Sequence, residues 1–449
     1  MEERLVSYDP ASGAPIGDVA VTPVDAVAER VAASRAALSE WRARPIDERV
    51  EIVARAAAEI GPRGEELARL LSREMGKDLG RAMGEVRSCA SDAPYKGRLV
   101  ADALAPRTIG GPGGTRISYR PLGVCAVITP WNYPMMMAHW MIVPALVAGN
   151  TVVLKPSEET PLIAQAYVDA LTGVLPENVL QVVHGGDAVG KALVAADVNL
   201  VAFTGSREAG KHIMASAAGG LKRLIMELGG NDPLIVLGDA DLDRAAHFAV
   251  ANSFENAGQM CIATERVFVD AAVADAFEEK VAAIASRYRV GAWDDPGADI
   301  GPIINGRQRD HIIAHIDAAL AEGARALVGG AAHPDRFVSP TVLADVTDDM
   351  RVAMEETFGP VVCITRFDDI DAAVASANAS PYGLGAVVFG GAGAEAVAER
   401  LEAGMIGING GVGGGGDTPW VGAKESGYGF HGSPEGHRQF AQVRVTNLG

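Results

Sequence analysis

The sequence predicts an α/β protein with two domains built on parallel sheets, and three observations lead to this fold class. The chain has 449 residues, which exceeds the roughly 150 residues of a typical single domain. Apolar residues make up 48% of it and charged residues 21%, as in globular proteins with a large core. From Gly123 onward, short apolar runs alternate with helical patterns, which is typical of βαβ units whose sheet is covered on both faces.

The N-terminal part is expected to be helical from about Pro23 to Gly97, because Ala, Leu, Glu and Arg recur there at three- and four-residue spacing. A Gly- and Pro-rich stretch over 105–114 ends this pattern and leads to a short β run over 115–119. The C-terminal run QVRVTN has no partner near it in sequence. It therefore pairs either with 115–119 or with a sheet in another subunit.

Between these ends, two groups of strands are expected. The strands of the first domain lie in GVCAVITP, TVVLKP, VLQVVHG and LVAFTG. A second α/β domain is expected to begin near Gly229, with strands in PLIVLGDA, RVFVDA, ALVGG, VVCITRF and GAVVFGG. Each of these runs has a helical pattern close to it, as βαβ units require.

Charge and cysteine usage exclude several classes of function. Lys and Arg total 39 against 57 for Asp and Glu, so the net charge of −18 disfavours nucleic acid and anionic membranes. The four cysteines lie at least 36 positions apart, and neither they nor the nine histidines show metal-ligand spacing. The N-terminus has no signal pattern, and the apolar stretch 135–154 is interrupted by His, Pro, Gly and Asn. These features predict a cytoplasmic protein without a metal.

Three glycine-containing turns are candidates for a dinucleotide site. Gly391 to Ala396 matches a short dinucleotide-binding fingerprint but has no acidic residue about 20 positions on to bind a ribose, and 411–416 is followed by Pro rather than by a helix. Gly205 and Ser206 join a strand to a helix, where free N–H groups can bind an anion. A plain serine N-cap is the alternative for this turn.

Cys261, in NAGQMC, is the candidate nucleophile, although an isolated cysteine with apolar neighbours is more often an inert core residue. A catalytic cysteine needs a base and donors for the oxyanion that it generates. Asn132 and Glu227 are the candidates for these groups, and both are expected at strand ends, where α/β sheets place their chemistry. An isolated glutamate at such a position is more often a solvated loop residue, which is the alternative for Glu227.

Seven segments in one order resemble the aldehyde dehydrogenase superfamily over nearly the whole chain: ITPWNYP, VVLKPSEETP, FTGS, MELGG, NAGQMC, EETFGPV and PWVGAKESGYG. The resemblance implies an NAD-binding domain (1–106 and 121–228), a catalytic domain (229–435) and oligomerisation strands (107–120 and 436–449). It also implies a homodimer or homotetramer.

The resemblance assigns a role to each motif residue. Cys261 would attack the aldehyde, Asn132 and the Cys261 backbone N–H would hold the oxyanion, and Glu227 would activate the water that hydrolyses the thioester. The implied cofactor residues are Trp131, Lys155, Ser157, Glu158, Gly205, Ser206, Leu228, Glu356 and Phe358. A carboxylate at Glu158 repels a 2′-phosphate, which favours NAD, with NADP as the alternative.

The implied substrate pocket consists of Tyr133, Met136, Trp140, Glu255, Met260, Ile262 and Trp420. Trp140 and Glu255 stand where relatives that oxidise succinic semialdehyde carry arginines, which disfavours that substrate unless Arg116 or Arg207 substitutes. The aromatic residues match those of betaine-aldehyde and aminoaldehyde dehydrogenases, and a neutral apolar aldehyde is the alternative.

Two further features concern the chemistry that follows substrate binding. A CoA-acylating enzyme is a rival, and Glu227 argues against it, because enzymes of that type typically lack this glutamate. Met141 replaces a lysine to which a proton relay is assigned in many relatives, so the route by which protons leave the site stays open.

Overall fold

The first of two large sheets carries the N-terminal half of the chain. The computed structural model describes residues 3–110, 113–330 and 334–448. The sheet has the order β17-β9-β8-β5-β6-β7. Its strands are β5 (Val124–Ile128), β6 (Thr151–Lys155), β7 (Leu180–Val182), β8 (Leu200–Thr204), β9 (Arg223–Glu227) and β17 (Gly427–Tyr428). The three central strands β5, β6 and β8 are buried along their whole length, which explains their continuous apolar runs.

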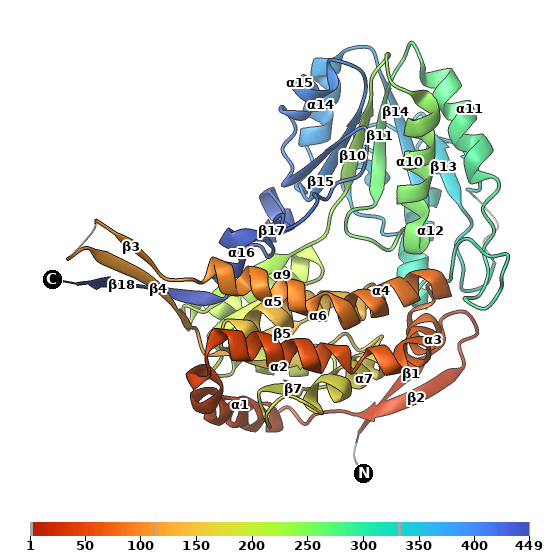
Figure 1. Cartoon of the computed structure of the whole chain (residues 1–449). Coiled ribbons are helices and arrows are strands. Elements are labelled where there is room, and N and C mark those ends of the chain that lie inside the picture. Colours follow the sequence, from red (N-terminus) through yellow and green to blue (C-terminus); the bar gives the residue numbers. More distant parts are fainter. Residues whose placement is uncertain (1–2, 111–112, 331–333, 449) are drawn as a thin grey trace.

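Nine helices of the described residues accompany this sheet. They are α1 (Ala26–Ala43), α2 (Ile46–Ala58), α3 (Gly64–Met75), α4 (Leu79–Ser91), α5 (Ala93–Ala103), α6 (Pro134–Val147), α7 (Pro161–Thr172), α8 (Asp187–Ala195) and α9 (Arg207–Ala218). Figure 1 shows α2, α4 and α5 side by side with α6. The helical character predicted for 23–97 is confirmed, and a helix also continues to Ala103.

The second sheet has the order β12-β13-β14-β11-β10-β15-β16. Its strands are β10 (Asp232–Val236), β11 (Thr264–Asp270), β12 (Arg325–Val328), β13 (Thr341–Ala344), β14 (Val361–Phe367), β15 (Gly385–Phe389) and β16 (Met405–Ile408). The accompanying helices are α10 (Leu242–Phe254), α11 (Ala274–Ala285), α12 (Gly306–Ala321), α13 (Arg351–Met354), α14 (Ile370–Asn378) and α15 (Ala394–Ala398). The predicted α/β class is thus confirmed.

The two sheets are mixed rather than wholly parallel. The edge strand β12 runs antiparallel to β13, and β17 runs antiparallel to β9. β17 lies late in the chain, yet it joins the first sheet and pairs Gly427 with Glu227. The sequence analysis did not predict the strands β13 and β16. It also missed an N-terminal hairpin of β1 (Arg4–Tyr8) and β2 (Pro15–Ala20).

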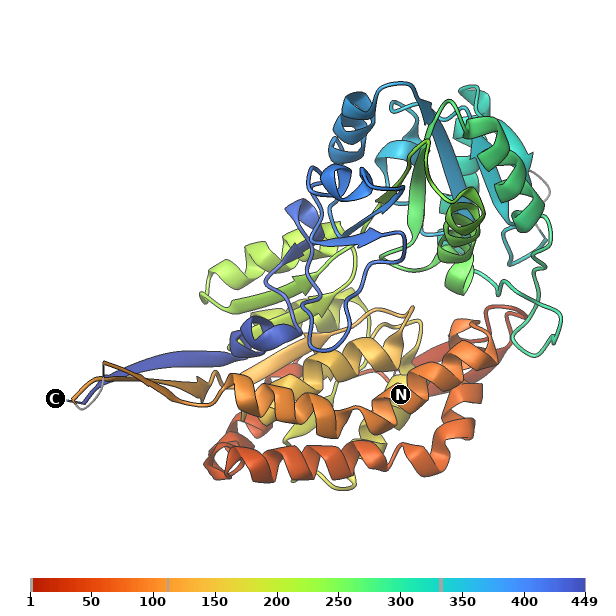
Figure 2. The same cartoon turned by 45° about the horizontal axis from the view of Figure 1, so that its top comes forward.

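A three-stranded antiparallel sheet, β18-β4-β3, projects from the body as an arm (Figures 1 and 2). Its strands are β3 (Arg107–Ile109), β4 (Thr115–Pro121) and β18 (Ala441–Asn447), and the short helix α16 (Ser433–Gln439) precedes β18. The C-terminal strand therefore pairs with β4 of its own chain, which decides between the two pairings open to it. No helix within the described ranges is long and apolar enough to cross a lipid bilayer.

Candidate active site

A cavity of about 1030 Å³ lies between the two large sheets and is lined from both. All 19 residues that the sequence analysis selected line it. They are Trp131, Asn132, Tyr133, Met136, Trp140, Lys155, Ser157, Glu158, Gly205, Ser206, Glu227, Leu228, Glu255, Met260, Cys261, Ile262, Glu356, Phe358 and Trp420. Parallel strands place their carboxyl ends at one edge of a sheet, which is why residues distant in sequence meet here.

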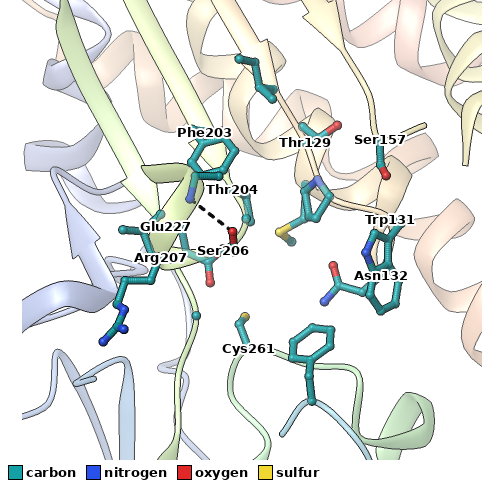
Figure 3. Close-up of a pocket in the computed structure, with 18 of the residues that line it drawn as sticks. Thr129, Trp131, Asn132, Ser157, Phe203, Thr204, Ser206, Arg207, Glu227 and Cys261 are labelled. Carbon is teal, nitrogen blue, oxygen red and sulfur yellow. Dashed lines mark hydrogen bonds between the residues drawn. The ribbon is translucent and has the colours of Figure 1, made fainter. Parts of the chain in front are cut away.

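Cys261 lies in a turn directly before β11, at the end of an unusual loop. Asn256, Ala257 and Gly258 have φ values of 53°, 59° and 72°, so three successive residues are left-handed. Only glycine fits at position 258, because a Cβ there would lie 2.0 Å from the Gly359 carbonyl oxygen. This loop turns the cysteine toward the cavity, where Figure 3 shows its sulfur facing the same open space as Glu227 and Asn132.

Glu227 is the last residue of β9 and is 4% exposed. Burial raises the pKa of its carboxyl to about 7. The Cys261 thiol, the Trp420 indole and the Thr204 hydroxyl favour its charged form. Neither carboxyl oxygen, however, has a hydrogen-bond partner with complete geometry among the described residues. The group is thus poised to gain or lose a proton near neutral pH.

The same burial also affects Cys261, where it lowers the fraction of reactive thiolate. Burial, followed by the charge of Glu227, raises the pKa of the thiol well above its usual range. The resting cysteine is therefore a thiol, and it must lose its proton as it attacks. The other three cysteines are free and buried, as expected for structural residues.

The side-chain amide of Asn132 is held by two hydrogen bonds. Its Nδ2 donates to the Gln259 carbonyl oxygen at 3.0 Å, and its Oδ1 accepts from the Tyr133 backbone N–H at 3.1 Å. These bonds fix the plane of the amide, and one N–H of the NH₂ group stays available to a ligand. Asn132 can therefore act as a preorganised oxyanion donor.

The turn that carries Asn132 rests on a buried ion pair that sequence reasoning missed. Glu85 accepts from the backbone N–H groups of Met135 and Met136 at 3.0 Å each, and Lys77 Nζ lies 2.7 Å from its other oxygen. Both side chains are at most 1% exposed. No motif marks this pair, since the two residues lie in the N-terminal helical region, far from the seven segments.

The carboxyl ends of β6 and β8 form a groove that fits a dinucleotide. Lys155 Nζ lies 3.0 Å from Glu158 Oε2, which places a cation and a carboxylate together at the end of β6. Gly205 and Ser206 precede α9, and Ser206 caps the helix by accepting from Ala209 N. Residues 205–209 line the cavity, so the start of this helix faces the groove, where its positive end can bind an anion.

Two residues of the loop between α13 and β14, Glu356 and Phe358, close the other side of this groove. Glu356 Oε1 accepts from Gly230 N at 2.9 Å. A Cβ at Gly229 would lie 2.3 Å from Glu356 Oε2, so glycine is needed for this approach. The Phe358 ring meets the Trp131 ring edge-on at 5.5 Å. The groove thus runs from Glu158 past the α9 turn to Cys261, and its donors suit ribose hydroxyls and phosphates.

The substrate end of the cavity is aromatic and rich in methionine. Trp140 and Trp420 pack against each other at a tilt, with 5.6 Å between ring centroids. The Tyr133 hydroxyl lies 3.4 Å from Glu255 Oε1. Met136, Met260 and Ile262 complete the lining. The chemistry of this end therefore comes mainly from aromatic and apolar side chains.

Three cations of the chain itself lie against this wall. Lys77 Nζ is 3.7 Å from the centroid of the Tyr133 ring, and Lys96 Nζ is 4.7 Å from that of Trp140. Arg81 lies 3.6 Å from Glu255. Three of the four groups predicted to attract a cationic substrate, Tyr133, Trp140 and Glu255, are thus already engaged with a lysine or an arginine; Trp420 is the fourth.

Other residues named from the sequence find clear places. Arg116 lies on the arm and does not line the cavity, whereas Arg207 lines it from α9 and stacks over Tyr382 at 5.1 Å. Met141 is buried in the core. Among the described residues, no cluster of three His, Cys, Asp or Glu side chains could hold a metal ion.

Comparisons with known proteins agree with this geometry. Residues 1–446 match the model of the aldehyde dehydrogenase family. A Sinorhizobium fredii protein named a probable NADP+-dependent succinate-semialdehyde dehydrogenase is 38% identical, over 100% of this chain and 93% of its own length. Succinate-semialdehyde dehydrogenase from Burkholderia pseudomallei superposes with a TM-score of 0.95 at 37% identity (99% and 94% of the two chains). Betaine aldehyde dehydrogenase from Staphylococcus aureus, solved with NAD+, gives 0.94 at 32% (99% and 92%).

The chain belongs to the aldehyde dehydrogenase family. The predicted class of enzyme, an aldehyde dehydrogenase that uses NAD or NADP, is confirmed by these findings.

Proposed function

We propose that this enzyme oxidises a neutral, mainly aromatic or apolar aldehyde to its acid through a thioester on Cys261. The observation that carries the proposal is the meeting of three side chains from separate segments, Cys261, Glu227 and Asn132, in one cavity. The cavity continues to a groove that suits a dinucleotide. A nucleophile, a base and an oxyanion donor beside such a groove are what the reaction requires.

The first half of the reaction forms the bond between sulfur and carbon. Cys261 Sγ attacks the carbonyl carbon while its proton leaves toward Glu227, whose carboxyl acts directly on the thiol. The carbonyl oxygen takes up the negative charge, and the Asn132 amide and the Cys261 backbone N–H donate to it. When the groove holds a nicotinamide dinucleotide, that group would supply the acceptor for the hydride that leaves this carbon, and the adduct would become a thioester.

The second half releases the acid. Glu227 first releases to solvent the proton that it received from the thiol. It then takes a proton from a water molecule, the water oxygen bonds to the thioester carbon, the C–S bond breaks, and the sulfur leaves as a thiolate that takes this proton back from Glu227. A pKa of about 7 suits a base that must work near neutral pH. The presence of this base supports hydrolysis over transfer to CoA.

NAD is the proposed cofactor rather than NADP. Glu158 lies three residues after the end of β6 and pairs with Lys155. This ion pair engages the Lys155 ammonium, which would otherwise attract a 2′-phosphate. A carboxylate accepts hydrogen bonds from ribose hydroxyls and repels a phosphate. The NADP+-dependent relative shows that both cofactors are used among similar proteins.

The substrate class follows from the wall of the cavity. The cations Lys77, Lys96 and Arg81 act on the groups that would attract a quaternary ammonium, so a neutral aldehyde is preferred over betaine aldehyde. A carboxylate substrate is not favoured either. The arginines and lysines that line the cavity among the described residues are Lys155, Lys191, Arg207 and Arg307, and none of them lies on α6, within 255–262 or beside Trp420, where the substrate wall is formed.

The test is NADH formation by the wild type and by Cys261→Ala with benzaldehyde, a medium-chain aldehyde, betaine aldehyde, aminobutyraldehyde and succinic semialdehyde, under NAD and NADP. We expect the highest kcat/KM for the neutral aldehydes with NAD. The alanine variant should form no NADH but still bind NAD. Turnover by Cys261→Ala would reject the mechanism, and a preference for succinic semialdehyde would reject the substrate class.

We also propose that the arm joins subunits into a dimer or tetramer. In the register of β18 and β4, Val443 and Val445 share a face with Tyr119 and Ile117, and both valines are at least half exposed. An apolar face of this kind on a projecting sheet is typical of an interface. Val443→Glu is expected to reduce the mass measured by light scattering. A monomeric wild type would contradict the proposal.

The proposed compartment is the cytoplasm. All four cysteines are free thiols in the structure, which is typical of proteins kept in a reducing environment. Fractionation of cells that make the protein would test this location.

A further inference from the structure

Three buried polar groups without hydrogen-bond partners line one part of the cavity. They are both carboxyl oxygens of Glu227, the Thr204 hydroxyl and the Trp420 indole nitrogen. Leaving a buried polar atom unpaired is unfavourable, so such atoms are few in folded proteins. Several around one carboxyl indicate an arrangement that is completed during the reaction.

The chemistry of the three groups is complementary. The indole N–H of Trp420 can only donate, and an ionised carboxylate can only accept. The Thr204 hydroxyl can donate to the same carboxylate. Both groups already favour the charged form of Glu227, because they lie close to it without reaching complete hydrogen-bond geometry. A small rotation of the glutamate side chain would complete both bonds.

The rotation must come from Glu227, because Trp420 is fixed. Its ring packs at a tilt against Trp140, whose ring also packs against His431 at 5.4 Å between centroids. The backbone N–H of Trp420 donates to the His431 carbonyl at 2.8 Å. A few residues on, Gly427 of β17 pairs directly with Glu227 of β9. The indole and the base are therefore held in one local unit.

We propose that Trp420 is a positioning residue for hydrolysis: its indole N–H, together with the Thr204 hydroxyl, holds the Glu227 carboxylate in the orientation that takes a proton from water. The same ring is part of the substrate wall, so a single side chain links the fit of the substrate to the orientation of the base. This inference rests on the proposed function and adds a residue to its second half.

The decisive comparison is Trp420→Phe against Trp140→Phe, since both variants keep an aromatic ring in the wall and only the first removes the N–H beside Glu227. The NADH burst and the rate of thioester breakdown are measured from pH 5.5 to 9 with an aldehyde that the wild type oxidises. In Trp420→Phe, breakdown should slow about tenfold, as expected for a lost hydrogen bond to a charged group. Its pH midpoint should rise, and the burst should remain.

Trp140→Phe should change KM for the aldehyde but leave the pH midpoint of breakdown unchanged. Thr204→Val, which removes only a hydroxyl, should shift the midpoint in the same direction as Trp420→Phe. An unshifted midpoint in Trp420→Phe, or an equal shift in Trp140→Phe, would overturn the inference. If the wild type shows no burst, or Glu227→Gln hydrolyses its thioester normally, the proposed function itself fails.

Discussion

Buried glutamates lie both in the turns that flank the cavity and at its centre, and they differ in their hydrogen bonds. Glu85 and Glu265 each accept two backbone N–H groups, from Met135 and Met136 and from the 357–358 turn, at 2.7–3.0 Å. Glu227 is as deeply buried but has no complete hydrogen bond among the described residues. All three carry the same side chain, so the difference lies in what surrounds it.

This difference separates the polar groups that hold the site from those that react in it. A buried carboxylate with fixed donors stabilises a turn, and its removal leaves those donors unpaired. Burial raises the pKa of both kinds of carboxyl, to about 7 in Glu227 and to about 8 in Glu265, so the pKa does not separate them. What separates them is that the oxygens of Glu265 are engaged by backbone donors, whereas those of Glu227 are free to act on a thiol or a water in the cavity. The three predictions below follow from the contrast.

The largest effect is expected from Glu227→Gln, which should remove activity without removing stability. Thioester breakdown should fall about 10²–10⁴-fold, the usual contribution of a general base, and the NADH burst should fall less. In the wild type, breakdown should rise with pH through about 7, because only the carboxylate can take a proton from water. Stopped-flow measurement of NADH formation across pH would show both changes.

The stability of the same variant has a defined sign. Folding raises the pKa of Glu227 from the usual 4.5 to about 7, so the wild type loses stability as pH rises through that interval. The glutamine variant has no such charge, and at pH 8 it should resist denaturant at least as well as the wild type. A clear loss of stability of the glutamine variant at pH 8 would mean that Glu227 holds the structure together, as Glu85 and Glu265 do.

The next effect is on folding, through Lys77→Met. This change leaves Glu85 buried without its cation, which typically costs about 3–5 kcal/mol. Arg98→Met is the matched control, because Arg98 and Asp47 form an exposed pair that is worth at most about 1 kcal/mol. Urea unfolding of both variants measures the contrast. Equal midpoints would show that the buried pair does not support the turn at Asn132.

The sequence is sufficient to name the residues proposed to react and insufficient to name those that hold them. Asn132, Glu227 and Cys261 lie in ordered motifs with glycine or proline neighbours, and these motifs predict all three. Lys77 and Glu85 carry no motif, because a buried ion pair is defined by the side chains that pack around it and not by its own spacing. Thr204 was part of a motif, but its orphaned hydroxyl is visible only in three dimensions.

The fold shows the same division. Local apolar runs such as VCAVI predict the central strands, because both faces of these strands are buried. The pairing of β17 with β9 joins residues about 200 positions apart through two residues only, Gly427 and Tyr428. A two-residue strand has no periodicity that could reveal it. The hairpin of β1 and β2 was missed because its residues are mostly exposed or half-buried and lack a long apolar run.

The smallest effect is expected from Glu265→Gln. This variant tests whether a glutamate that holds a turn also supports the cofactor groove. Glu265 accepts from Thr357 N and Phe358 N at 2.7 Å each, and an amide can accept at one end only, so one donor is left unpaired. The variant should lose about 1–3 kcal/mol of stability. It should also bind NAD more weakly, because the turn beside Glu356 is no longer fixed.

The control for this variant is Glu74→Gln. Glu74 accepts in the same way from Leu162 N and Ile163 N at the start of α7, and it does not line the cavity. Both variants should lose comparable stability in urea unfolding, but only Glu265→Gln should raise the dissociation constant for NAD in a fluorescence titration. The two losses have the same physical origin, and only the place of the turn differs. An equal rise in both variants would mean that NAD affinity reports general loosening of the fold rather than the position of the 356–358 turn.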